Sequence, residues 1–321
     1  MLKNCSRFYS AVAKSNKQLL DEFYQYHTTR MNLRPLIYRP KNATLLRSMD
    51  LKDPETNKPI QPREPMKPLK KQVLNNFVQE IPQGSKELMD FLQKWFKVSN
   101  RKRELFAFLE GSHLQVMLVA SLFRIGHYSH VLGLLHSYQS KVVGTGNTKA
   151  YDQDRFFNTV LMCSLLRNDL KDLKDAEIGL KKLKVNWGKV TEKNDTLGLT
   201  QPLLEAYANQ QGISKEDLVL KGRETISNIN LPSIGDESRF SRLVTFITEN
   251  KYTYFLARTI QKFSESCPSE IETFINEYKN ALTTLKKDDE YDWSVQNMTE
   301  VNKIPEETKQ ETETQEETQE Q

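Results

Sequence analysis

Apolar residues recur at intervals of three and four positions over residues 114–125 and again over 128–138, with Gly126 and His127 between the two runs. That interval places the apolar side chains of each run along one face of a helix. The segment LQVMLVASLFRIGHYSHVLGLLHSY therefore predicts two helices joined by a tight turn. Such a hairpin leaves apolar surface uncovered unless neighbouring helices stack on it.

The same order of helix, polar turn and helix recurs three more times along the chain, over residues 156–183, 202–226 and 240–263. Measured between the turn residues Gly126, Asn168, Gly212 and Asn250, the turns lie 42, 44 and 38 residues apart. This spacing has the size of a helical repeat. We expect the following residues to be buried between hairpins: Leu118, Leu122, Leu134, Val160, Leu165 and Phe246.

The fold class follows from these patterns. We find no β-hairpin signal, and two further helices rich in aromatic residues are expected over 73–111. We therefore predict an all-α protein, an α-solenoid-like array of helical hairpins over residues 73–285, with an extended N-terminal arm and a disordered acidic C-terminal tail.

The predicted arm covers residues 10–72. Seven of the twelve prolines and none of the glycines lie between Arg30 and Gln72, which predicts an extended chain without a long helix. Residues 1–72 contain 15 Lys or Arg against 6 Asp or Glu, whereas residues 288–321 contain 2 against 12. This asymmetry indicates a basic arm that faces a polyanion.

Guanidinium groups spaced along an extended arm can follow a phosphate backbone, and an aromatic ring among them can stack on a base. A basic triplet in a polar turn further along the chain is a second candidate for phosphate contact. The predicted RNA-binding residues are Arg30, Arg34, Tyr38, Arg39, Lys41, Arg47, Arg101, Lys102 and Arg103. The alternative for the arm is a linker without a binding role.

The first residues have the composition of a mitochondrial transit peptide, because basic and hydroxyl residues are frequent and no acidic residue precedes Asp21. Arg7-Phe8-Tyr9-Ser10 resembles a matrix processing site, so residues 1–9 are the predicted transit peptide and the mitochondrial matrix is the expected location. No apolar run is long enough to be a transmembrane segment.

The tail is predicted over residues 286–321, which are rich in Glu, Thr and Gln and can bury little apolar surface. Tyr291 and Trp293 are its last plausible anchors. The three cysteines have no ligand spacing, and His113, His127, His130 and His136 have no partner donors at ligand spacing, so we expect no metal site and no cofactor. No catalytic constellation is recognisable, and we expect no small-molecule substrate.

The second hairpin opens with Phe156-Phe157-Asn158-Thr159-Val160, which resembles the first helix of a pentatricopeptide-type repeat. That family binds single-stranded RNA in organelles, and the resemblance implies that Asn158 stands where a base would be read. With its transit peptide, basic arm and acidic tail, the whole chain is also similar to fungal-specific proteins of the mitochondrial small ribosomal subunit with degenerate helical repeats.

These resemblances imply a non-catalytic structural constituent of the mitochondrial small ribosomal subunit. Its expected partners are the mitochondrial small-subunit rRNA and neighbouring ribosomal proteins, and its expected role is to support mitochondrial translation. Two alternatives remain open. One is a free mitochondrial RNA-binding factor that activates translation or stabilises transcripts, and the other is an enzyme.

Overall fold

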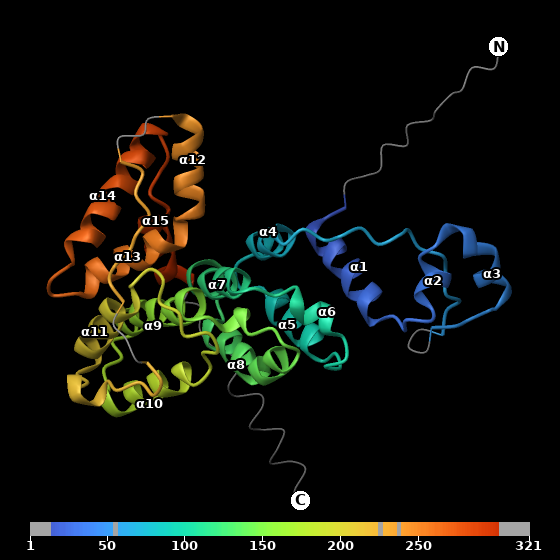
Figure 1. Cartoon of the computed structure of the whole chain (residues 1–321), viewed down its shortest axis with the longest axis horizontal. Helices are drawn as coiled ribbons and strands as arrows, with labels where there is room; N and C mark the ends of the chain where they lie inside the picture. Colours follow the sequence, from blue (N-terminus) through green and yellow to red (C-terminus); the bar gives the residue numbers. More distant parts are fainter. Residues whose placement is uncertain (1–13, 54–56, 224–226, 236–238, 302–321) are drawn as a thin grey trace, which may run out of the picture.

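The computed structural model describes residues 14–53, 57–223, 227–235 and 239–301, and the regular structure within these ranges is helical (Figure 1). Two isolated β-bridges, Lys52 with Pro59 and Asp152 with Glu192, are the extended pairings found there. The predicted all-α, solenoid-like class is confirmed. No helix in the described part of the chain is both long enough and apolar enough to span a bilayer.

The array begins with three helices, α4 (Gln72–Glu80), α5 (Glu87–Phe96) and α6 (Arg103–Ala107). The central hairpin follows as α7 (Gly111–Ala120), a π-helical turn η2 (Ser121–Ile125) and α8 (Tyr128–Gly144). Gly126 has φ +94° and His127 has φ +62°, so the chain reverses where the sequence places a glycine. The central hairpin is confirmed.

Two of the other predicted hairpins also form. The second hairpin pairs α9 (Asn158–Leu170) with α10 (Ala176–Trp187), and the short helices η3 (Lys149–Tyr151) and η4 (Gln153–Phe157) precede it. The fourth hairpin pairs α12 (Phe240–Glu249) with α13 (Lys251–Phe263). The turn between α9 and α10 lies a few residues later than predicted, at 171–175.

The third hairpin is predicted wrongly in its second half. Helix α11 (Thr200–Gln211) is present, but the described residues from Asp217 onward contain no α-helix before α12, only the end of η5 (Lys215–Asp217). The carbonyl of Lys221 accepts hydrogen bonds from Trp187 Nε1 at 2.9 Å and Lys193 Nζ at 3.1 Å. In a helix, this carbonyl would accept from a backbone N–H of the following turn. Gly222, with φ +75°, also interrupts helical geometry.

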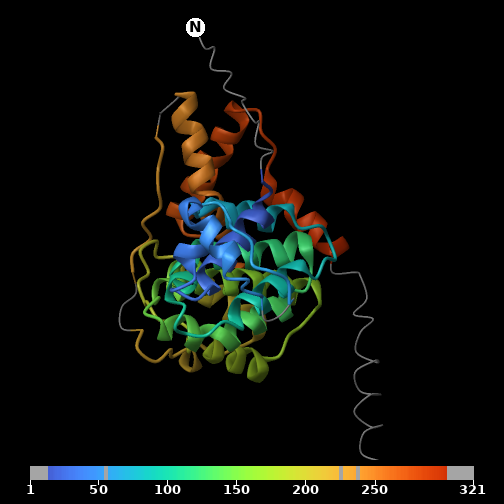
Figure 2. The ribbon, with the colours of Figure 1, turned by 90° about the vertical axis from the view of Figure 1, so that its right-hand side faces the viewer.

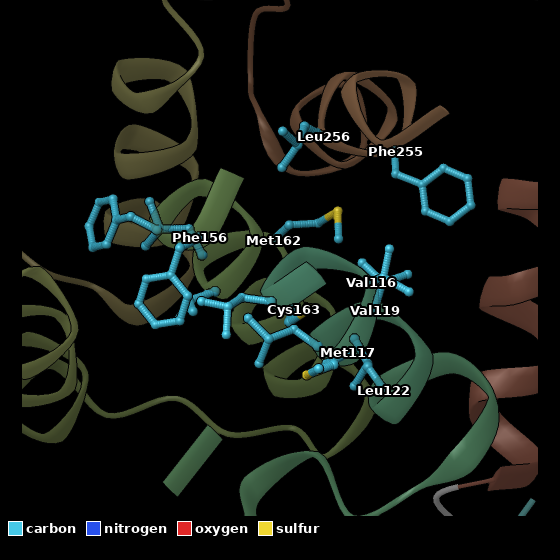
Figure 3. Close-up of a cluster of buried hydrophobic side chains, with 14 of the residues drawn as sticks. Val116, Met117, Val119, Leu122, Phe156, Met162, Cys163, Phe255 and Leu256 are labelled. Carbon is cyan, nitrogen blue, oxygen red and sulfur yellow. The ribbon is translucent and has the colours of Figure 1, made fainter. Parts of the chain in front are cut away.

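The core lies between α7, α9 and α13. Almost every residue of α7 is buried, because this helix is covered by α4, α8, α9 and the short helices η3 and η4. Figure 3 shows Val116 and Met117 of α7 beside Met162 and Cys163 of α9, with Phe255 and Leu256 of α13 above them. Five of the six residues predicted to be buried are buried; Leu134 is half-buried, and Leu135 takes the inward position.

Hydrogen bonds between hairpins join positions about one repeat apart. Gln115 Nε2 donates to Thr159 Oγ1 at 3.0 Å, Thr200 Oγ1 donates to Asn158 Oδ1 at 2.9 Å, and Gln210 Nε2 donates to the Leu165 carbonyl at 2.9 Å. The paired residues are 44, 42 and 45 positions apart. The first helices of successive hairpins, α7, α9 and α11, therefore pack against one another in register.

The expected extended arm is only partly extended. Residues 16–48 contain α1 (Asn16–Thr28), α2 (Arg34–Ile37), η1 (Pro40–Asn42) and α3 (Ala43–Ser48), whereas the described part of 49–71 lacks helix apart from the turn that leads into α4. The prolines explain the difference, because α2 and η1 each have a proline at their first or second position, where it starts a helix without loss of a hydrogen bond.

The N-terminal residues form a lobe on the array. Leu20 and Phe23 of α1 join the main core, and α1 packs on α4. Ile37, Tyr38 and Leu46 form a separate small core that links α2 and α3. Figure 2 views the molecule from this side, with the lobe in front of the array.

The predicted tail boundary at 286 is wrong. After α14 (Ser269–Thr284), residues 290–301 form helix α15 (Glu290–Val301), which packs on η2. Tyr291 is buried with 4% exposure, whereas Trp293 is 57% exposed. Tyr291, Ser294, Met298 and Val301 recur at helical spacing, a pattern that the acidic composition of the segment conceals. The rest of the predicted tail, 302–321, and the predicted transit peptide, 1–9, lie outside the described residues.

Candidate nucleic-acid interface

The C-terminal end of α1 brings the two predicted basic segments together. Arg34 Nε and Lys102 Nζ both donate to the carbonyl of Thr29, each at 3.3 Å, and Arg34 Nη2 donates to the His27 carbonyl at 2.9 Å. Carbonyls in the last turn of a helix lack intrahelical partners and attract cations. The arm and the 101–103 turn therefore meet at this point, although about 70 residues separate them in sequence.

The exposed basic side chains of these segments define what we call the N-terminal basic surface: Arg30, Arg39, Lys41, Arg47, Arg101 and Arg103. None of the six side chains forms an ion pair or hydrogen bond within the described residues. Residues 30–49 and 97–103 contain no Asp or Glu at all. Glu104 directly follows Arg103, is exposed, and partly offsets the lowering of the Lys102 and His27 pKa values. The surface nevertheless has a net positive charge that is available to a polyanion.

Three of the predicted contact residues have structural roles. Arg34 caps α1 and lies over the ring of Tyr26, with its guanidinium carbon 4.8 Å from the ring centroid. Lys102 is half-buried against Thr29. Tyr38 is only 8% exposed, and its ring packs edge-on against Tyr26 at 4.9 Å, so its faces are not open to a base.

The cations around Thr29 repel one another. Burial lowers the pKa of Lys102, and the nearby positive charge of Arg34 lowers it further. Burial, followed by the charge of Arg34, likewise lowers the pKa of the His27 imidazole. An anion bound beside this cluster would offset the repulsion, which is the electrostatic behaviour expected of a phosphate-binding surface.

Lys97 is a contact candidate that the sequence analysis missed. It is exposed and directly follows α5, four residues before Arg101. The signal that could have identified it is the absence of acidic residues over the whole of 97–103, of which the triplet is only the most concentrated part.

Other candidate residues lie in the interior. Asn158 is fully buried and holds Thr200 in the contact between hairpins, so it cannot read a base from this position. His113 is buried and completes the N-terminal cap of α7, with its Nδ1 accepting from the Glu110 backbone N–H at 3.0 Å. The described residues contain no group of three or more His, Cys, Asp or Glu side chains that could hold a metal ion.

Stacked helical hairpins place the chain in the class of helical-repeat scaffolds, a class whose extended surfaces commonly bind other macromolecules. Comparison with protein families identifies the group within that class. Residues 4–80 match the MRP13-like N-terminal domain and residues 85–314 match the MRP13-like C-terminal domain, so the chain belongs to the MRP13-like family.

These are domains of mitochondrial ribosomal proteins, which implies a mitochondrial location and ribosomal partners and points to a structural role. The two family domains divide between α4 and α5, whereas the sequence analysis divides the chain at residue 72. The C-terminal domain also includes α15, in agreement with the packing of this helix on the array.

Proposed function

We propose that this protein is a structural constituent of the mitochondrial small ribosomal subunit, imported into the matrix, whose N-terminal basic surface contacts rRNA. The helical array then presents a broad, rigid face to neighbouring ribosomal proteins. In this role the protein supports mitochondrial translation without catalysing a reaction.

The observation that supports the RNA contact best is the convergence at Thr29. Two segments distant in sequence, both free of acidic residues, are joined there by Arg34 and Lys102, while their remaining cations point to solvent without partners in the described chain. Side chains that only stabilised the fold would be expected to pair with carboxylates, as Lys94 does with Asp21 at 2.7 Å.

Exposed cations that contact phosphates release counterions when they bind, so their removal weakens binding in a salt-dependent manner. The test variant is Arg39→Ala/Arg47→Ala/Arg101→Ala, which leaves the structural residues Arg34 and Lys102 in place. The matched control is Lys279→Ala/Lys286→Ala/Lys287→Ala, which removes three exposed charges from the C-terminal end of the array.

Tagged wild-type and variant proteins are sedimented from mitochondrial lysate over a series of salt concentrations. We expect the wild type and the control to co-sediment with small subunits, and the test variant to dissociate at lower salt. Wild-type protein that stays in light fractions at low salt would exclude the ribosomal assignment and favour a free RNA-binding factor. A test variant that behaves as the control does would refute the role of the N-terminal basic surface.

A further inference from the structure

A second concentration of positive charge lies on the array itself, at the ends of the second helices of successive hairpins. Three segments lie at these helix ends. Residues 97–103 connect α5 to α6, residues 141–151 run from the end of α8 through η3, and residues 181–191 comprise the second half of α10 and the start of the connection after it. Together they contain ten Lys or Arg and no Asp or Glu. We call these three segments the basic edge.

The opposite ends of the same helices differ in charge. The segments that join the two helices within the corresponding hairpins lie at residues 81–86, at 121–127, which include η2, and at 167–175, which include the last residues of α9. Together they contain five Lys or Arg and three Asp. The segment at 121–127 is mostly buried, because α15 packs on η2, whereas the segments at 81–86 and 167–175 are largely exposed. Residues 167–175 contain three Asp, so an exposed connection of this array is not in itself free of acidic residues. The positive charge is concentrated at one edge of the array.

The segments of the basic edge contact one another in order. Lys141 Nζ donates to the carbonyl of Phe96, which joins the second segment to the end of α5. Thr191 N donates to the Tyr151 carbonyl at 2.9 Å, which joins the third segment to the second. The edge is therefore continuous; α8 and α10 lie along the lower side of the array in Figure 1, and α5 packs on α8.

Two of the acidic residues that follow these segments are engaged in local interactions, whereas Glu104, which follows the first segment, is exposed. Asp152 accepts hydrogen bonds from the backbone N–H groups of Arg155 and Phe156 at the start of η4. Glu192 is half-buried and accepts from Thr148 Oγ1 at 2.6 Å. By contrast, the side chains of Lys149, Lys181, Lys182 and Lys184 are exposed and form no ion pair or hydrogen bond within the described residues.

We infer that the basic edge is a second RNA-binding surface, which contacts the phosphate backbone without reading sequence. It continues the N-terminal basic surface, because the first of its segments contains Arg101 and Arg103. The inference rests on the proposed function and adds the location of a second contact. A continuous series of Lys and Arg side chains with few carboxylates beside it complements the regular charge of a nucleic-acid backbone.

An acidic protein segment is the competing occupant. Ile178 and Val185 are each 50% exposed and lie one above the other on the outer face of α10, between Lys181 and Lys182. This aliphatic pair is confined to one helix, whereas the lysines extend over three segments. The extent of the positive charge therefore favours RNA over a protein helix that docks on α10.

The test uses the purified full chain and a fluorescent single-stranded RNA of about 30 nucleotides, with affinity measured from about 50 to about 300 mM KCl, the range over which phosphate binding responds strongly to salt. The edge variant is Lys181→Gln/Lys182→Gln/Lys184→Gln. The matched control is Lys86→Gln/Lys171→Gln/Lys174→Gln, which removes the same charge from exposed positions at the opposite edge. Circular dichroism and thermal unfolding of both variants show whether the fold is retained.

In the wild type, we expect Lys181, Lys182 and Lys184 each to neutralise one phosphate. At roughly 0.7 per phosphate, the slope of log affinity against log salt should then be smaller in magnitude by about 2 for the edge variant than for the wild type. The slope should not change for the control. Equal slopes for the two variants would refute the basic edge, and subunit association in the sedimentation assay would still support the proposed function. Weaker binding of poly-L-glutamate by Ile178→Ala/Val185→Ala, with RNA affinity unchanged in all variants, would overturn the inference in favour of a protein partner.

Discussion

Tyr291 and Trp293 give a direct test of the claim that α15 belongs to the folded array. Both aromatic residues lie in an acidic segment that composition alone assigns to a solvated tail, and they are two positions apart. On a helix, two positions correspond to about 200°, so the two side chains point to opposite sides. The Tyr291 ring packs edge-on against Phe255 at 5.4 Å, and the guanidinium carbon of Arg258 lies 4.9 Å from its centroid.

The expected cost of Tyr291→Ala follows from this environment. Truncation of a buried aromatic residue typically costs about 3–5 kcal/mol, because the cavity that remains adds to the transfer energy of the removed ring. The substitution also removes the hydroxyl that lies 3.3 Å from Thr259 Oγ1. Trp293→Ala removes a larger but exposed ring, and surface substitutions of this kind change the free energy of unfolding by about 0.5 kcal/mol or less.

Urea denaturation followed by circular dichroism measures both variants against the wild type. We expect a clearly lower midpoint for Tyr291→Ala and almost no change for Trp293→Ala. If both substitutions changed the free energy of unfolding by less than about 0.5 kcal/mol, the range of surface substitutions, α15 would not be packed on the array as described. A large destabilisation by Trp293→Ala alone would mean that the opposite face of the helix is the buried one.

Two further predictions concern the interior of the array. Leu122→Ala, at a fully buried position of the π-helical turn, should cost about 2–5 kcal/mol in the same urea titration. Leu134→Ala, at a half-buried position, should cost clearly less, and equal costs would contradict the described packing of the central hairpin. Burial, followed by the charge of Lys189, lowers the pKa of His136 to about 4, so the folded state resists a proton that the unfolded chain accepts near pH 6.5. The contribution of neutral His136 to the free energy of unfolding is therefore complete above about pH 6.5 and is lost as the pH falls towards 4. Between about pH 7 and pH 5, the free energy of unfolding should fall less for His136→Gln than for the wild type.

The parts of the fold that the sequence predicts best are those in which hydrophobic periodicity and a turn residue agree. Residues 114–138 have both, with helical spacing on either side of Gly126, and the structure has the expected helices and turn there. Where composition is the main guide, the prediction fails. The acidic residues of 290–301 conceal the spacing of Tyr291, Met298 and Val301, and the prolines of the arm suggest extension although two of them start short helices.

The candidate interface is predictable in charge but not in geometry. The sequence contains both basic segments, yet nothing in it indicates that Arg34 and Lys102 share the carbonyl of Thr29, since the contact of Lys102 depends on how α1 packs on α6. For the same reason, Tyr38 resembles an exposed stacking residue in the sequence and is part of a small core in the structure. Partner residues that are distant in sequence decide which cations remain free.

Ultraviolet crosslinking of purified mitochondrial small subunits, followed by mass spectrometry of RNA-linked peptides, tests the central claim most directly. The account predicts that this protein is present in the particle and that its crosslinked peptides come from residues 30–47 and 97–103, which contain the N-terminal basic surface. Absence of the protein from small subunits, or crosslinks confined to α12–α15, would contradict it.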